Sequence, residues 1–400
     1  HSFCLWMVRR WFTELDIDPS ATVMDAEEAK LLRNDVLEDL FEKLYAFAAV
    51  PGDPLGKGEL HAPPTEPAPF DADAWRLGGR SLEALSPDFN RLVDLHGLGE
   101  DAGIAALVLR LHEFTRSQTD PGTWLTACVT RLVSPSQDVL EETAAALRVE
   151  LERQAEFCDR RAAEIENGPA VGHFYAAKIR DYETNLRRWR ADLGESPDPA
   201  AFERVRAAVD AFKFDPTRAP PLSSKKDAAL IEQREPAQKA FSEKVKKRLF
   251  DERLHPRFAR SSVAEMRDHL AATAGYVATL VDLVARFDAE YTSAKRRLNV
   301  LDFNDLERFA LQLLQQEEIA ASLRRRFAHV LVDEFQDINP VQQEILRLVS
   351  RESDPAAAGN LFVVGDVKQS IYRFRLAEPR LFTERVERSR GGERDQALFL

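Results

Sequence analysis

The spacing of apolar residues predicts that most of the chain is helical. Over residues 25–49 the apolar side chains follow the period of an amphipathic helix. Asp25 is placed to be the N-cap of this helix, and Glu28 completes a capping box. Similar patterns recur, between breaks rich in Pro and Gly, as far as residue 297. We therefore expect residues 31–300 to form a mostly helical region.

Near the C-terminal end the pattern changes from helical repeats to short apolar runs. Residues 301–315 still predict a helix. Two runs rich in branched side chains, 329–334 and 360–366, then flank a helical segment at 339–350. This order is typical of a βαβ unit, in which parallel strands are buried on both faces of the sheet.

Polar residues stand where both predicted strands end. Asp333 and Glu334 close the first apolar run, and Asp366 closes the second, with Gln369 just beyond. Neighbouring parallel strands end at the same edge of a sheet, which is where ligands bind in open α/β folds. These side chains should therefore face one crevice.

This set of side chains suits the transfer of a phosphoryl group to water. One carboxylate holds the Mg²⁺ that bridges two phosphates, a second activates the water, and a polar amide touches the γ-phosphate. Asp333 fits the metal, Glu334 the water and Gln369 the γ-phosphate. The alternative is an ordinary solvated turn after a strand, and the first acidic run alone leaves both interpretations open.

The segment after the second strand interleaves aromatic and basic residues, among them Tyr372, Phe374 and Arg375. Aromatic rings stack on unpaired bases and arginine pairs with phosphates, so the segment is a candidate contact for single-stranded nucleic acid. The alternative is that Tyr372 and Phe374 pack beneath the edge of the sheet.

Length and charge set limits on these interpretations. A chain of 400 residues is too long for one small core and predicts two or three packed units. A net charge of −12 argues against a nucleic-acid footprint over the whole surface, although a local basic groove is compatible with it. The stretch at 244–260 is rich in Lys and Arg and is one candidate; a solvated helix face is an equal alternative.

Cysteine usage and the lack of targeting signals indicate the compartment. Three scattered cysteines, with no CxxC pair, predict neither disulfides nor a zinc site. No apolar run approaches the length that spans a bilayer, and the first residues lack the layout of a signal peptide. We expect a cytoplasmic protein without membrane contact. Because the chain starts with His1, we also expect it to be a piece of a longer one.

Four short motifs, in the same order, resemble those of the UvrD-type superfamily 1 DNA helicases. LVDEFQDINPVQQEIL resembles motif II and VVGDVKQSIYRFRLAEP resembles motif III. HSFC at residues 1–4 resembles the end of motif Ib, and LDFNDL at 301–306 resembles the segment before motif II. The wording of motif III is most similar to the AddA component of AddAB helicase-nucleases, the counterparts of RecBCD.

The resemblance implies an α/β fold that is mostly helical. It would contain part of a RecA-like P-loop NTPase domain with a parallel sheet, and a large all-α insertion like subdomain 1B. Residues 1–30 and 301–400 would belong to the RecA-like domain 1A, and residues 31–300 would include the insertion. The chain would then run from motif Ib to motif III of a bacterial helicase.

The resemblance also implies roles for single residues, with ATP and Mg²⁺ as cofactors. Asp333 would hold Mg²⁺, Glu334 would activate water, and Gln369 would couple the γ-phosphate to the DNA site. The DNA contacts that it implies are Ser2, Phe3, Tyr372, Phe374 and Arg375. For Asp302 and Phe303 we expect a helix cap and a core aromatic residue instead.

The implied function is that of an ATP-dependent DNA helicase acting at DNA ends in double-strand break repair and recombination, with a second subunit of the AddB type. The chain contains no G-x-x-x-x-G-K-[ST] loop, and the nearest stretch, GDPLGKG at 52–58, has the wrong spacing. The chain alone is therefore expected not to hydrolyse ATP. The alternatives are a non-hydrolysing scaffold that binds DNA or a partner, and a single-chain repair helicase of the UvrD, PcrA or Rep type.

Overall fold

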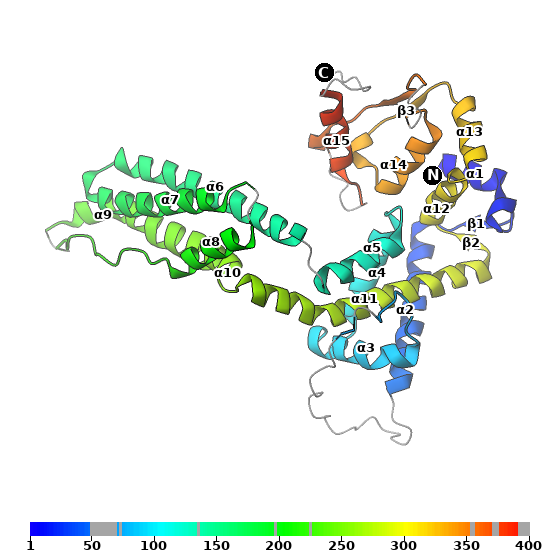
Figure 1. The fold of residues 1–400 in the computed structure, drawn as a ribbon, viewed down its shortest axis with the longest axis horizontal. Coiled ribbons are helices and arrows are strands. Elements are labelled where there is room, and N and C mark those ends of the chain that lie inside the picture. Colours follow the sequence, from blue (N-terminus) through cyan, green and yellow to red (C-terminus); the bar gives the residue numbers. More distant parts are fainter. Residues whose placement is uncertain are drawn as a thin grey trace. The chain divides into compact units, whose positions relative to one another are not determined.

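The protein is described here by a computed structural model covering residues 1–48, 70–71, 74–133, 137–195, 198–223, 226–352, 357–369 and 376–390. It divides into two compact units. One consists of His1–Val129 together with Gly275–Leu400, and the other of Thr130–Ala274. Figure 1 traces the chain through both units.

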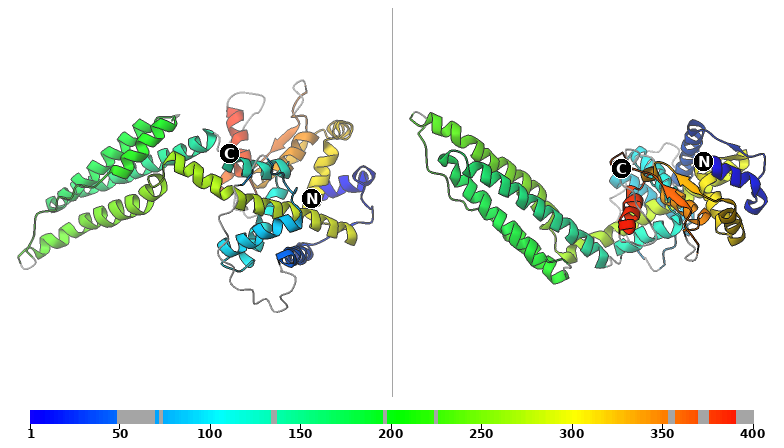
Figure 2. Two further views of the ribbon diagram at one scale, coloured as in Figure 1. Left: turned by 60° about the horizontal axis from the view of Figure 1, so that its bottom comes forward. Right: turned by 90° about the horizontal axis from the view of Figure 1, so that it is seen from above.

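The unit at Thr130–Ala274 is a bundle of helices, and its described residues contain no strand. Helices α6 and α7 run side by side (Figures 1 and 2) and place Leu147, Tyr182 and Trp189 in a fully buried core. The elements of the unit are α6 (Gln137–Glu166), α7 (His173–Leu193), α8 (Pro199–Ala211), α9 (Ala228–Lys239), a π-type helix (Ala240–Leu254) and α10 (His255–Phe258).

The other unit has a helical part built around Leu40, Phe89 and Phe287, which are fully buried. The predicted start of its first long helix is confirmed. Asp25 Oδ1 accepts from the backbone N–H of Glu28 over 2.9 Å, and the Glu28 carboxylate accepts from the N–H of Asp25 over 3.0 Å. The helices are α2 (Ala26–Ala48), α3 (Leu82–His96), α4 (Ala102–Arg116), α5 (Pro121–Val133) and α11 (Val263–Leu298).

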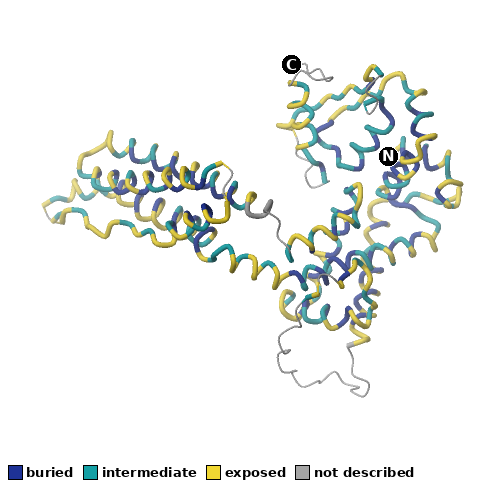
Figure 3. Tube along the Cα trace, in the orientation of Figure 1, coloured by how far each residue is buried: buried dark blue, intermediate teal, exposed yellow. Residues whose placement is uncertain are grey.

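Helix α11 is long and apolar enough, by length and composition, to cross a membrane, with an 18-residue window of mean hydropathy 1.4. The expectation that no run approaches this length is therefore wrong for α11. Its Val281 and Val284 are buried, and its buried Asp282 accepts hydrogen bonds from Trp75 and Arg80 (Figure 3). These contacts make α11 the central core helix of this part.

The α/β part of the same unit contains the predicted strand, helix and strand. They are β3 (Val330–Val332), α14 (Pro340–Val349) and β4 (Leu361–Val363), and the two strands pair in parallel. The βαβ prediction is confirmed. A parallel pair that the sequence did not reveal joins β1 (Thr22–Val23) to β2 (Val300–Leu301). The remaining helices are α1 (Ser2–Arg10), α12 (Phe303–Leu314), α13 (Glu317–Arg326) and α15 (Pro379–Arg390).

The prediction that this sheet is buried on both faces is wrong for the described residues. Leu331 lies opposite Phe362 in the register of β3 and β4, and these side chains are 73% and 57% exposed. Alternate residues of a strand point to opposite faces, so both side chains lie on one face of the sheet. That face is uncovered in the described part of the chain, whereas Val330 and Val332 are half-buried.

Candidate active site

The two loops that follow β3 and β4 carry the predicted catalytic residues. Asp333 and Glu334 come directly after β3, and Asp366 follows β4. Gln369 ends the short 3-10 turn Val367–Gln369. Because β3 and β4 are parallel neighbours, both loops leave the same edge of the sheet, as the sequence predicted.

The carboxylates of the first loop are open to solvent. Asp333 and Glu334 are both exposed, and neither makes a salt bridge within the described residues. The backbone N–H of Glu334 donates to Asp333 Oδ1 over 3.0 Å. Free carboxylate oxygens are suitable ligands for Mg²⁺, which usually takes only one or two of them beside water and phosphate oxygens. This donor set fits such an ion, although no cluster of three metal-ligating side chains occurs among the described residues.

Glu334 adopts an uncommon backbone conformation. Its φ of 52° and ψ of 43° lie in the left-handed region, which costs a residue with a Cβ roughly 1–2 kcal/mol. The next residue, Phe335, is fully buried, and its N–H donates to the carbonyl of Val364 over 2.9 Å. Packing and a bond to the neighbouring loop therefore hold Glu334 in place, as is common at functional sites.

Gln336 belongs to the site, and the sequence reasoning missed it. Its side chain is fully buried; Nε2 donates to Glu334 Oε2 over 2.6 Å, and Oε1 accepts from the backbone N–H of Asp366 over 2.9 Å. Glutamine is mostly exposed in proteins, so its position in the sequence gave little signal. Gly365 was the available hint, because a Cβ there would lie 2.6 Å from Gln336 Oε1.

Gln369 is tied to Asp366 within the second loop. Its side-chain Nε2 donates to Asp366 Oδ2 over 3.1 Å, and its backbone N–H donates to the carbonyl of Asp366 over 2.9 Å. The amide of Gln369 is itself exposed. Hydrogen bonds therefore connect Glu334, through Gln336 and Asp366, to Gln369.

A buried acid of α12 fastens the helix that follows the first loop. Asn339 caps α14, and Gln342 completes the capping box. Both side-chain amides donate to Glu307, over 3.2 Å from Asn339 Nδ2 and 2.7 Å from Gln342 Nε2. Glu307 is only 4% exposed. It thus links α12 to the start of α14, a few residues after Glu334.

The predicted DNA contacts are only partly described. Ser2 is exposed at the start of α1, and Phe3 is half-buried, with its ring centroid 5.9 Å from that of Trp6 and 6.1 Å from that of Phe327. Phe3 is thus part of an aromatic group on the surface of the α/β part. The other three predicted contacts lie outside the described residues; they are Tyr372, Phe374 and Arg375.

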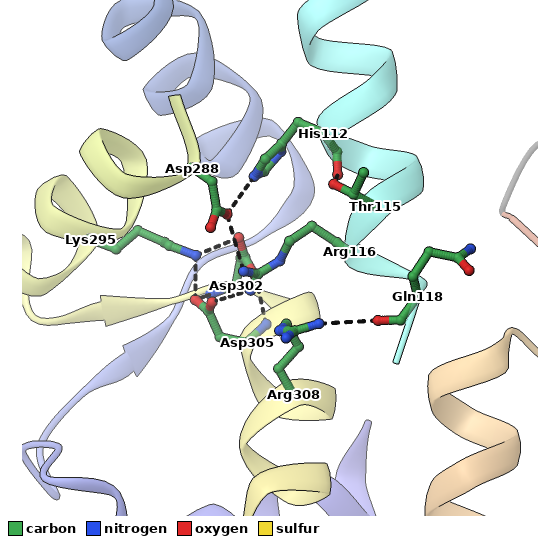
Figure 4. A network of polar contacts seen from close by, with 9 residues as sticks. All are labelled: His112, Thr115, Arg116, Gln118, Asp288, Lys295, Asp302, Asp305 and Arg308. Carbon is green, nitrogen blue, oxygen red and sulfur yellow. Dashed lines mark hydrogen bonds and ion pairs between the residues drawn. The ribbon is translucent and has the colours of Figure 1, made fainter. Parts of the chain in front are cut away.

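The acids before motif II are buried in a network of charges (Figure 4). Lys295 Nζ contacts Asp302 over 2.9 Å and Asp305 over 2.6 Å, and Arg116 reaches Asp305 over 2.7 Å. Asp302 also caps α12 in a capping box with Asp305, so the expected helix cap is confirmed. The expectation for Phe303 is wrong: it is 42% exposed rather than in the core.

The network continues to α4 and α11. Arg116 contacts Asp288 over 3.2 Å, and the imidazole of His112 contacts it over 2.9 Å. Burial opposes ionisation of Asp302, but the charges of Lys295 and Arg116 outweigh it and lower its pKa. Burial acts on Asp288 too, yet His112 and Arg116 bring its pKa down to about 2. Burial lowers the pKa of His112 and favours its neutral form.

The basic stretch at 244–260 lies on the π-type helix and α10. Its apolar residues Val245 and Phe250 are buried in the core of their unit, whereas Lys244 and Arg248 are exposed. A solvated helix face and a groove for nucleic acid both fit this arrangement, so DNA binding there stays a prediction.

Comparisons with known proteins agree with the motifs. The profile of a family described as UvrD/REP helicase N-terminal domain matches residues 173–389, which include both acidic loops. Three curated relatives are named as ATP-dependent helicase/nuclease subunits of type A. The protein of Moorella thermoacetica is 35% identical over 98% of this chain, that of Desulfitobacterium hafniense 36% over 96%, and that of Listeria monocytogenes 31% over 97%.

The chain is short beside these relatives. It spans 26% of the Moorella protein, 25% of the Desulfitobacterium protein and 28% of the Listeria protein. The similarity therefore covers about a quarter of each relative and nearly the whole of this chain.

Proposed function

We infer the activity of the whole protein from the premise that this chain belongs to the UvrD/REP helicase N-terminal domain family. We propose that the protein is an ATP-driven DNA helicase and translocase of the AddA kind, acting at DNA ends in double-strand break repair and recombination. The observation that carries the proposal is the placement of Asp333, Glu334 and Gln369 on two adjacent loops at one edge of a parallel sheet. Similarity to relatives named helicase/nuclease subunits supports it.

In this proposal each polar residue of the loops has one task in the hydrolysis of ATP. Mg²⁺, held by Asp333, would bridge the β- and γ-phosphates and offset their charge. The carboxylate of Glu334 orients a water molecule and takes its proton as the water attacks the γ-phosphorus. The exposed amide of Gln369 hydrogen-bonds the γ-phosphate and loses that partner when the phosphate leaves.

Loss of the γ-phosphate is proposed to drive movement along DNA. Phe374 would stack on a base of the bound strand, with Tyr372 and Arg375 nearby. Ser2 and Phe3 would lie beside the path of the same strand. The exposed cations of the 244–260 stretch would touch duplex DNA ahead of the junction.

The remaining assignments follow the same proposal. Residues 1–30 and 301–400 would be part of a RecA-like domain 1A, and residues 31–300 would include a 1B-like helical insertion. The protein would work in the bacterial cytoplasm with a second subunit of the AddB type, since its relatives are named as one subunit of an enzyme.

Substitution of the proposed base in the full-length protein tests the proposal. Glu334→Gln keeps the shape and removes the carboxylate, so DNA-stimulated ATP hydrolysis should fall by about 10²–10⁴-fold. Binding of a fluorescent ATP analogue with Mg²⁺ should persist, because Asp333 is unchanged. Steady-state hydrolysis with and without single-stranded DNA measures the first effect, and equilibrium titration measures the second.

The matched control is Glu318→Gln, the same change at an exposed position in the first turn of α13. It should leave hydrolysis unchanged. Hydrolysis retained in Glu334→Gln would remove the role given to Glu334. A wild-type protein that binds DNA and shows no ATP turnover would instead favour the non-hydrolysing scaffold.

A further inference from the structure

The side chain of Gln336 joins the two loops that carry the candidate catalytic residues. It accepts from the backbone N–H of Asp366 on one side and donates to the Glu334 carboxylate on the other. Since a backbone N–H is always a donor, Oε1 must face Asp366 and the NH₂ group must face Glu334. An amide supplies both functions at once, whereas an ionised carboxylate only accepts and an ammonium group only donates.

The second loop is built to receive this side chain. A Cβ at Gly365 would lie 2.6 Å from Gln336 Oε1 and 3.3 Å from its backbone nitrogen. Any residue other than glycine would therefore displace the amide from Asp366. Gly365 and Gln336 come from different loops and depend on each other through this close approach.

The bond from Gln336 acts on a residue that its own backbone does not favour. Glu334 has a positive φ, and its carboxylate is otherwise exposed to solvent. The 2.6 Å bond from Gln336 Nε2 is charge-assisted and gives the carboxylate a fixed direction. On the far side, Asp366 receives the amide of Gln369, so both ends of the path are candidate catalytic groups.

We propose that Gln336 is a positioning residue that couples the placement of Glu334 to the state of Gln369, an inference that rests on the function proposed above. When Gln369 engages a γ-phosphate, its hold on Asp366 changes, and the backbone N–H of Asp366 carries that change to Gln336. Gln336 then orients the Glu334 carboxylate toward the attacking water. Without the amide, Glu334 keeps its chemistry and loses its direction.

The test is a set of variants of the full-length protein assayed for DNA-stimulated ATP hydrolysis. Gln336→Leu keeps most of the volume and removes both bonds, so kcat should fall about 10- to 100-fold, as for other residues that orient a reacting group. KM for ATP should change less than kcat, because Asp333 is untouched. The DNA stimulation ratio should fall with kcat.

Gln336→Glu separates positioning from a merely structural role. It sets a second carboxyl beside Glu334, and the two groups then hold a proton more readily. The acid limb of the pH profile of kcat should move to higher pH by about one unit. A loss that came only from misfolding would lower kcat at all pH values and leave the limb in place.

Gly365→Ala, made in the other loop, should reproduce the loss seen in Gln336→Leu. The two changes together should cost little more than either alone, because they break the same contact. Gln343→Glu, the same chemical change on α14, is the matched control and should leave both kcat and the pH profile unchanged. Folding of each variant is checked by circular dichroism and by binding of the ATP analogue.

The outcomes are distinguishable. Wild-type kcat in Gln336→Leu, or an unmoved acid limb in Gln336→Glu, would overturn the coupling role and leave the proposed helicase function standing. A wild-type protein without DNA-stimulated hydrolysis would overturn the proposed function and this inference together.

Discussion

Two pairs of acids in the same unit look alike in sequence and differ entirely in structure. Asp302 and Asp305 follow the short strand β2, just as Asp333 and Glu334 follow β3. The first pair is less than 10% exposed and is matched by Lys295 and Arg116 (Figure 4). The second pair is exposed and makes no salt bridge in the described part of the chain.

The difference separates a structural charge from an available one. Buried carboxylates must be paired, and the pairing uses up their capacity to bind anything else. The network of Asp302 and Asp305 therefore fixes α12 against α4 and α11. The free oxygens of Asp333 and Glu334 remain open to a cation and to water, which is why these residues carry the proposed chemistry.

The largest effect should come from removing the buried cation. Lys295→Met leaves Asp302 and Asp305 without their shared partner, so the free energy of unfolding should drop by about 3–5 kcal/mol. The control is Lys43→Met, which breaks an exposed pair with Glu290 and should cost less than about 1 kcal/mol. Urea denaturation of the 400-residue chain measures both. Equal small losses would show that the network does not hold the fold.

A smaller effect should distinguish the two pairs directly. Asp302→Asn keeps a good helix cap and loses the charge beside Lys295, so it should destabilise the chain by about 1.5–3 kcal/mol. Asp333→Asn makes the same change at an exposed position and should stay within about 0.5 kcal/mol. A large loss in Asp333→Asn would mean that this acid is structural too, and its role as a metal ligand would lose its support.

The sequence predicted the site better than its surroundings. The apolar runs of β3 and β4 and the capping residues Asp25 and Asp302 are local signals, and local patterns translate well into local structure. Placement of Asp333 at the edge of the sheet followed from the rule for parallel strands. The pairing of β1 with β2 joins residues 22 and 300, and such short, distant strands leave no periodic signal.

The errors concern burial, which depends on what other parts of the chain cover. Leu331 and Phe362 look like core residues in sequence, and one face of their sheet is open in the described residues. Phe303 also looked apolar enough for the core, and its position in the first turn of α12 exposes it. Gln336 is the reverse case, a polar residue that is fully buried because two loops offer it one donor and one acceptor.

The smallest effect in this comparison is the dependence of stability on pH. The folded pKa values of Asp288 and Asp302 are lowered, so their stabilisation is complete above the unfolded value near 4 and is lost as pH falls toward the folded values, about 2 for Asp288. Burial lowers the pKa of His112, so its contribution weakens earlier, as pH drops below about 6.5.

The network should therefore weaken as the solution becomes acidic, in two steps. Urea midpoints of the wild type at about pH 7, 5 and 3 should fall steadily, and Asp302→Asn should show a flatter fall between the two lower values, because its carboxyl is already gone. Asp333→Asn should follow the wild-type curve, since an exposed carboxylate without a partner gains nothing from ionisation on folding. Parallel curves for wild type and Asp302→Asn would show that the charge of Asp302 does not stabilise the buried network.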